Sequence, residues 1–176
     1  MTFDARAKHL ALLLFDVDGV LTDGTVDLHG DGTESKQFHI RDGTAIVLAH
    51  RVGLLTGVLS ARQSATTTQR ATQLGMRVIV QGVSDKRAEF DRVCKELDLA
   101  PEQVAYMGDD LLDLPVLTRV GISGAPADAV AEVRARVDVV TDASGGRGAV
   151  REFVERLLRA RNEWQDIVDG FAGGGH

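Results

Sequence analysis

Short apolar runs alternate along most of the chain with longer segments in which apolar residues recur at helical spacing. This alternation is typical of repeated βα units, which form a mostly parallel sheet covered by helices. The predicted strands cover residues 10–16, 54–59, 77–80, 104–107, 120–123 and 137–140. The predicted helices cover residues 43–52, 64–74, 84–97, 111–119 and 127–136, followed by an amphipathic helix over 147–161. The expected fold class is therefore α/β.

One segment interrupts the alternation. Residues 25–40 place apolar residues on either side of the turn sequence His29-Gly30-Asp31-Gly32-Thr33, which is typical of a β-hairpin. The hairpin directly follows the first βα strand, so it could cover a site at the sheet edge or pair with another copy of the chain. A surface insertion without a function is the alternative.

Composition narrows the class of protein. The chain has 176 residues, of which 44% are hydrophobic and 26% charged, so we expect one soluble domain over residues 1–161 and a tail over 162–176. The net charge of -6 and the lack of a basic run argue against a nucleic-acid partner. The single Cys94 excludes an internal disulfide and a cysteine-rich metal site. No signal peptide or membrane span is predicted, which favours a cytoplasmic protein with no membrane partner.

Two carboxylates stand where the first strand ends. Asp16 and Asp18 are separated by one residue and are followed by Gly19. Open α/β sheets bind ligands at the carboxyl ends of their strands. Two acids this close favour a divalent metal, or one neutral and one ionised carboxyl group. An acidic helix cap or turn is the alternative.

Three further polar signals follow later strands. Ser60-Ala61-Arg62 offers a hydroxyl and backbone N–H groups to phosphate oxygens, although Ser60 alone could cap a helix. Lys86 lies near a predicted helix start, where the helix dipole disfavours a cation, so it either has another reason to be there or is an exposed lysine. The segment Gly108-Asp109-Asp110-Leu111-Leu112-Asp113 is a second acidic cluster, or a set of capping residues.

In this order, the four signals resemble the haloacid dehalogenase superfamily of phosphohydrolases, and the match covers nearly the whole chain. The resemblance implies a three-layer Rossmann-like fold with a central parallel sheet. It also implies that Asp16 is the nucleophile that forms an aspartyl-phosphate, while Asp18 is the general acid and then the general base. The remaining implied roles are phosphate binding by Ser60, Ala61 and Lys86, Mg²⁺ binding by Asp16, Asp109 and the backbone carbonyl of Asp18, and support from Asp110 and Asp113.

Elementary electrostatics supports this division of roles. A carboxylate is a poor nucleophile towards a dianionic phosphate unless the repulsion between them is neutralised. Lys86 and a metal would supply that neutralisation.

Five segments resemble a narrower family, the 3-deoxy-D-manno-octulosonate 8-phosphate phosphatases of lipopolysaccharide biosynthesis. They are Asp18–Gly24, Phe38–Gly43, Gln81-Gly82, Val104–Leu111 and Gly145–Glu152. Members lack a cap domain and close the site by assembling as tetramers, with the hairpins at the centre. The resemblance therefore implies a capless homotetramer that hydrolyses this sugar acid phosphate.

The same resemblance names sugar contacts, and guanidinium groups suit a substrate with a carboxylate and a phosphate. The implied contacts are Asp18, His39, Ile40, Arg41, Asp42, Gly43, Arg62, Arg70 and Lys86. Arg70 could instead be a solvated helix residue. Val47 stands where the family often has an arginine, so a sialic-acid-type 9-phosphate is an alternative substrate. A non-catalytic, metal-binding assembly module is the alternative from another class.

Overall fold

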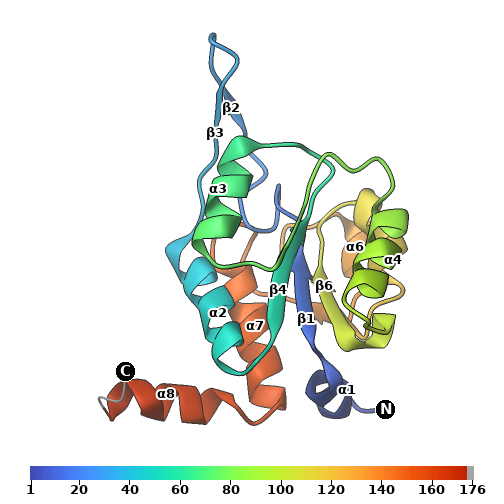
Figure 1. Ribbon diagram of the computed structural model, residues 1–176, viewed down its shortest axis with the longest axis vertical. Coiled ribbons are helices and arrows are strands. Elements are labelled where there is room, and N and C mark those ends of the chain that lie inside the picture. Colours follow the sequence, from blue (N-terminus) through green and yellow to red (C-terminus); the bar gives the residue numbers. More distant parts are fainter. Residues whose placement is uncertain (174–176) are drawn as a thin grey trace.

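The computed structural model describes residues 1–173, in which a six-stranded sheet lies between two layers of helices (Figure 1). Neighbouring strands are parallel throughout this sheet. In their order across it, the strands are β5 (Val78–Val80), β4 (Leu55–Leu59), β1 (Leu12–Phe15), β6 (Val104–Met107), β7 (Ile122–Ala125) and β8 (Val139–Val140). The predicted α/β class and every predicted strand are confirmed, although β7 lies two residues later than expected.

Helices cover both faces because successive strand residues point to opposite sides of a sheet. Leu13 and Phe15 of β1 belong to one apolar core, and Leu12 and Leu14 belong to the other. The first core is covered by α1 (Phe3–His9), α2 (Ile40–Arg51), α3 (Ala65–Gln73), α7 (Ala149–Ala160) and α8 (Trp164–Ala172). The second is covered by α4 (Lys86–Glu96), α5 (Leu114–Leu117) and α6 (Ala131–Arg134). Two 3₁₀ turns complete the list, η1 (Pro101–Gln103) and η2 (Leu111–Asp113).

The central strands end side by side. Phe15, the last residue of β1, lies opposite Val58 of β4 and Met107 of β6. The chain leaves β1 towards β4 on one side and later returns to β6 on the other. The carboxyl end of β1 is therefore the switch point at which open α/β sheets bind ligands.

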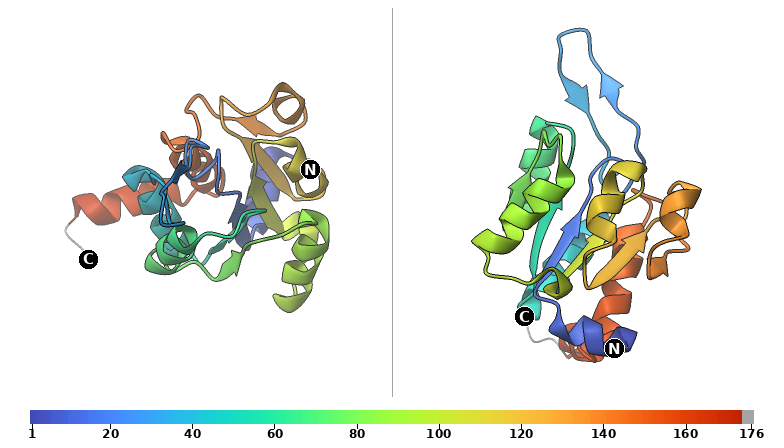
Figure 2. Two further views of the ribbon diagram at one scale, coloured as in Figure 1. Left: turned by 90° about the horizontal axis from the view of Figure 1, so that it is seen from above. Right: turned by 90° about the vertical axis from the view of Figure 1, so that its right-hand side faces the viewer.

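The predicted hairpin is present and projects beyond this edge of the sheet (Figures 1 and 2). Its antiparallel strands are β2 (Asp27–Leu28) and β3 (Glu34–Ser35). The N–H of His29 donates to the carbonyl of Thr33 at 2.9 Å, and Gly32 supplies the positive φ of +85° that the turn requires. The expected hairpin span is too long, since α2 begins at Ile40.

Two predicted helices are shorter than expected. Over 127–136, only α6 is helical, because the N–H of Ala127 donates to Ala143 and the N–H of Val130 donates to Asp109. These bonds hold residues 127–130 in a turn that is tied to the loops at Ala143 and Asp109, so the helix begins only after them. Over 111–119, η2 precedes the four-residue α5.

The expected C-terminal tail is largely wrong. Residues Trp164–Ala172 form α8, which buries Trp164 and Ile167 against the first core. The guanidinium groups of Arg151 and Arg159 lie 4.9 and 5.3 Å from the centre of the Trp164 ring. Residues 174–176 of the predicted tail lie outside the described residues. Helix α1 was not predicted.

Within residues 1–173, no helix has the length and apolar character that crossing a bilayer requires. Cys94 is a buried residue of α4, and burial raises the pKa of its thiol to about 11.

Candidate active site

Loops from neighbouring strands meet at the switch point. Asp16 follows β1, Ser60 follows β4, and Asp109 lies two residues after β6. A cavity of about 220 Å³ opens between them. Its lining residues are Asp16, Asp18, Ser60, Ala61, Arg62, Lys86, Asp109, Asp110, Leu112 and Asp113. The structure thus brings together every residue predicted for catalysis, phosphate binding and metal binding.

Lys86 lies at the floor of this site. Its Nζ donates to Oδ1 of Asp16 at 2.8 Å and to Oδ1 of Asp113 at 2.6 Å. Burial alone would lower the pKa of Lys86, but attraction to the two carboxylates raises it above its ordinary value. Lys86 is therefore a buried, charged residue, and the alternative of an exposed lysine is wrong.

Tyr106 of β6 joins this network and was not predicted from the sequence. Its hydroxyl donates to Oδ1 of Asp113 at 2.5 Å and accepts from Lys86 at 3.2 Å. Oδ2 of Asp113 accepts from the backbone N–H groups of Asp109 and Asp110. Both oxygens of Asp113 are thus occupied, which makes it a residue that orients its neighbours.

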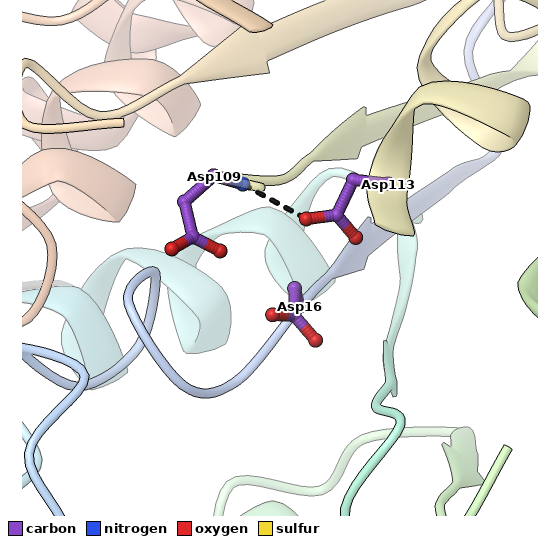
Figure 3. A group of neighbouring side chains, drawn as sticks. All are labelled: Asp16, Asp109 and Asp113. Atoms are coloured by element: carbon purple, nitrogen blue, oxygen red, sulfur yellow. Dashed lines mark hydrogen bonds between the residues drawn. The ribbon is translucent and has the colours of Figure 1, made fainter. Parts of the chain in front are cut away.

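Three carboxylates face one another in the site (Figure 3). Oxygens of Asp16, Asp109 and Asp113 lie within 4.8 Å of one another. Burial, followed by repulsion from Asp113, raises the pKa of Asp16 to about 6. Burial and repulsion from Asp16 raise the pKa of Asp109 to about 8. One lysine does not neutralise this set of acids, so the residues fit a divalent cation with a preference for oxygen ligands.

Gly19 lets the loop after β1 approach Asp109. Its φ is +92°, and a Cβ built on it would lie 2.1 Å from Oδ2 of Asp109. A side chain at position 19 would therefore displace one of the carboxylates of the site. This explains why glycine follows Asp18.

A second charged cluster surrounds the Asp18 carboxylate and was missed in part from the sequence. Lys36, just after β3, donates from Nζ to Oδ1 of Asp18 at 2.6 Å. Arg62 places Nε 3.5 Å from Oδ2 of Asp18, and its Nη2 donates to Glu34 at 2.8 Å. Glu34 and Lys36 are two residues apart, and alternate residues of a strand point to the same face. A strand predicted over 34–36 would therefore have placed both side chains on one face.

Most of the predicted sugar contacts lie away from this cavity. Arg62 lines it, but His39, Asp42, Gly43 and Arg70 line a separate cavity of about 10 Å³ between α2 and α3. His39 and Arg41 also border a groove along α7. Ile40 is exposed at the start of α2.

Asp42 has a structural role that the expected sugar contact does not fit. It is 1% exposed, and its carboxylate accepts hydrogen bonds from the N–H groups of Gly148 and Arg151 at the start of α7. Gly43 packs closely against α3, because a Cβ there would lie 3.1 Å from the side chain of Leu74 and 2.4 Å from Nη2 of Arg70, which would have to move. The Asp42 carboxylate and the small size of Gly43 therefore both serve the packing of α2.

The fold and the site are those of a haloacid dehalogenase-like hydrolase, and the model of that family matches residues 55–153. The 3-deoxy-D-manno-octulosonate 8-phosphate phosphatase of Escherichia coli K12 is 42% identical over 159 residues, which cover 90% of this chain and 85% of that protein. The chain belongs to the 3-deoxy-D-manno-octulosonate 8-phosphate phosphatases within the haloacid dehalogenase-like hydrolases.

Solved structures agree with this assignment. The phosphatase of Moraxella catarrhalis, in complex with magnesium, phosphate and the sugar acid, has a TM-score of 0.92 and 34% identity, covering 96% of this chain and 97% of that chain. A probable phosphatase of the YrbI family from Pseudomonas syringae has a TM-score of 0.94 and 42% identity, covering 98% of both chains. A cobalt-bound phosphatase from Haemophilus influenzae has a TM-score of 0.90 and 35% identity, covering 95% of this chain and 99% of that chain.

Proposed function

We propose that this chain is a Mg²⁺-dependent phosphomonoesterase that hydrolyses 3-deoxy-D-manno-octulosonate 8-phosphate to the free sugar acid and inorganic phosphate. The observation that carries the proposal is the cavity at the end of β1, where Asp16, Asp18 and Lys86 meet a second acidic loop. The Escherichia coli relative is a phosphatase of this ester, and the matched region covers 85% of its length.

Asp16 is the proposed nucleophile. One of its carboxylate oxygens bonds to phosphorus as the bond between phosphorus and the leaving oxygen breaks, which gives an aspartyl-phosphate. Asp18 donates a proton to the leaving oxygen of the sugar. It then removes a proton from the water that attacks phosphorus, which releases phosphate and restores the Asp16 carboxylate.

Ser60, Ala61 and Lys86 are the proposed phosphate-binding residues. Ser60 does not cap α3, because Ser64 accepts from the N–H of Thr67 and fills that position. The Ser60 Oγ accepts from the N–H of Arg62 at 3.3 Å, so its hydroxyl proton is available for a phosphoryl oxygen. The charge of Lys86 reduces the repulsion between the phosphate and the acids of the site.

Asp16, Asp109 and the backbone carbonyl of Asp18 are the proposed ligands of Mg²⁺. Asp113 is the less suitable ligand, because its oxygens already accept from Lys86, Tyr106 and two backbone N–H groups. When bound, the metal neutralises charge on the transferring phosphoryl group.

A substrate panel tests the proposal directly. Phosphate release is measured with Mg²⁺ on the octulosonate 8-phosphate, a sialic-acid-type 9-phosphate and uncharged sugar phosphates. We expect the highest kcat/KM for the octulosonate ester. A preference for an uncharged sugar phosphate would contradict the substrate, and no release from any ester would favour the non-catalytic assembly module.

The variant Asp16→Asn tests the nucleophile. We expect near-complete loss of phosphate release with the circular dichroism spectrum unchanged, because an amide oxygen is a much poorer nucleophile than a carboxylate. Normal turnover of the octulosonate ester by this variant would refute the mechanism.

We further propose that residues 1–161 form one catalytic domain, with α8 packed against its core, and that the enzyme is a cytoplasmic homotetramer. Two observations support assembly. Leu28 of the hairpin is an apolar residue that is 77% exposed. Arg70 and His39 lie outside the cavity of their own chain, so a neighbouring subunit would be needed to bring such residues to the substrate.

A further inference from the structure

We infer that Lys36 of the hairpin segment is a positioning residue for Asp18. The inference rests on the proposed function, in which Asp18 donates a proton to the leaving oxygen. It adds a residue that the motifs of the catalytic loops do not contain.

The first observation is the burial of Lys36. Its side chain is 0% exposed, and its Nζ lies 2.6 Å from Oδ1 of Asp18 and 3.8 Å from Oε1 of Glu34. Burying a lysine is unfavourable unless an acidic partner compensates for the lost hydration. The contact with Asp18 therefore accounts for the charge at this position.

The second observation is the difference between the two oxygens of Asp18. Oδ1 accepts the hydrogen bond from Lys36. Oδ2 is buried and has no hydrogen-bond partner within residues 1–173, with Nε of Arg62 3.5 Å away. By fixing Oδ1, Lys36 leaves Oδ2 as the oxygen that can exchange a proton with the substrate.

Glu34 holds a second cation, Arg62, beside the other carboxylate oxygen of Asp18. It accepts a hydrogen bond from Arg62 at 2.8 Å and lies beside Lys36. The base of the hairpin thus holds the two cations that flank Asp18, while its tip projects away from the sheet (Figure 2).

The dependence of the rate on the leaving group distinguishes positioning from a structural role. An alkyl leaving group needs a proton from Asp18, whereas p-nitrophenolate leaves without one. In single turnovers with Mg²⁺, Lys36→Met should slow cleavage of the sugar phosphate on the order of 100-fold, the scale of general acid catalysis. Cleavage of p-nitrophenyl phosphate should stay near the wild-type rate. Gln37→Met, at the neighbouring exposed position, is the matched control and should leave both rates unchanged.

Two outcomes would overturn the inference. Equal losses on both esters would indicate general damage to the site, and a rise in KM with kcat unchanged would make Lys36 a substrate anchor. If Lys36→Met does not fold, Lys36→Gln removes the same charge while keeping a polar end group, and the same comparison applies.

A double-mutant cycle tests whether Lys36 acts through Asp18. In an Asp18→Asn background, Lys36→Met should cause no further loss on the sugar phosphate, and additive losses would contradict the inference. Asp18→Asn alone also separates the two proposals. If it spares p-nitrophenyl phosphate while Lys36→Met does not, only the inference about Lys36 fails. If Asp18→Asn itself shows no dependence on the leaving group, the proposed role of Asp18 fails.

Discussion

At the scale of single residues, the site is defined by repulsion among buried carboxylates. Asp16 and Asp109 both have raised pKa values, Asp16 because of burial and the charge of Asp113, and Asp109 because of burial and the charge of Asp16. Such crowding is unfavourable for folding, and it is typical of sites that bind a cation or hold a proton. Two predictions follow from this balance of charge.

Without divalent metal, stability should fall as the pH rises from about 4 to about 8. The pKa of Asp109 is about 8 in the native state and 3.8 as its ordinary value, so the native state holds a proton that the unfolded state has lost. This contribution is complete below about pH 4 and is lost as the pH rises through about 8. We expect the melting temperature in EDTA to fall between about pH 4 and 8 and to level off at higher pH, and excess Mg²⁺ to reduce the fall. Equal slopes with and without Mg²⁺ would contradict a metal site at Asp109.

Asp16→Asn should remove activity and yet stabilise the metal-free protein. The amide removes the Asp16 charge that raises the pKa of Asp109, and a change of one pKa unit corresponds to about 1.4 kcal/mol. Urea unfolding in EDTA at pH 8 should therefore show a gain of roughly 1 kcal/mol. The comparison variant is Asp113→Asn, which also relieves repulsion but disturbs bonds from Lys86, Tyr106 and two backbone N–H groups, so it should lose about 1–3 kcal/mol. A loss of stability in both variants would show that repulsion is not the dominant effect at Asp16.

At the scale of secondary-structure elements, Asp42 connects α2 to the start of α7. Its carboxylate accepts from N–H groups that have no partner within a helix, as a capping residue does. Asp42→Ala should lower the free energy of unfolding by about 1–2 kcal/mol, while Asp4→Ala in the exposed first turn of α1 should have a smaller effect. Denaturant unfolding measures the difference. A large rise in KM with unchanged stability would instead restore Asp42 as a sugar contact.

The elements that could be predicted from the sequence are those whose surroundings are uniform. The strands are buried on both faces, so β1 and β6 are short apolar runs whatever packs on them, and motifs at their ends identify the site. The missed features depend on tertiary contacts. Helix α8 is stable because Trp164 packs on the core, and Lys36 belongs to the site because the hairpin base bends back to Asp18. A pattern along the chain does not contain either contact.

At the scale of the whole molecule, the hairpin is an exposed element that is connected to the site through Lys36 and Asp18. If it mediates assembly, Leu28→Asp should shift the protein to smaller species in sedimentation velocity, because a charge would have to be buried at the interface. Activity on the octulosonate ester should fall with the size of the assembly. Val140→Asp, at the exposed far edge of the sheet, is the control and should leave the size unchanged. An unchanged size for Leu28→Asp would place the assembly contact elsewhere.

The burial of Cys94 has a practical consequence for following the hairpin in solution. This is the single cysteine of the chain, and with a pKa of about 11 its thiol stays protonated and unreactive at neutral pH. A cysteine introduced at Gly30, where nothing lies within 4 Å of an added Cβ, would be the accessible thiol. A maleimide-linked fluorophore would then label the hairpin tip of the otherwise native enzyme, so its motion could be recorded during turnover.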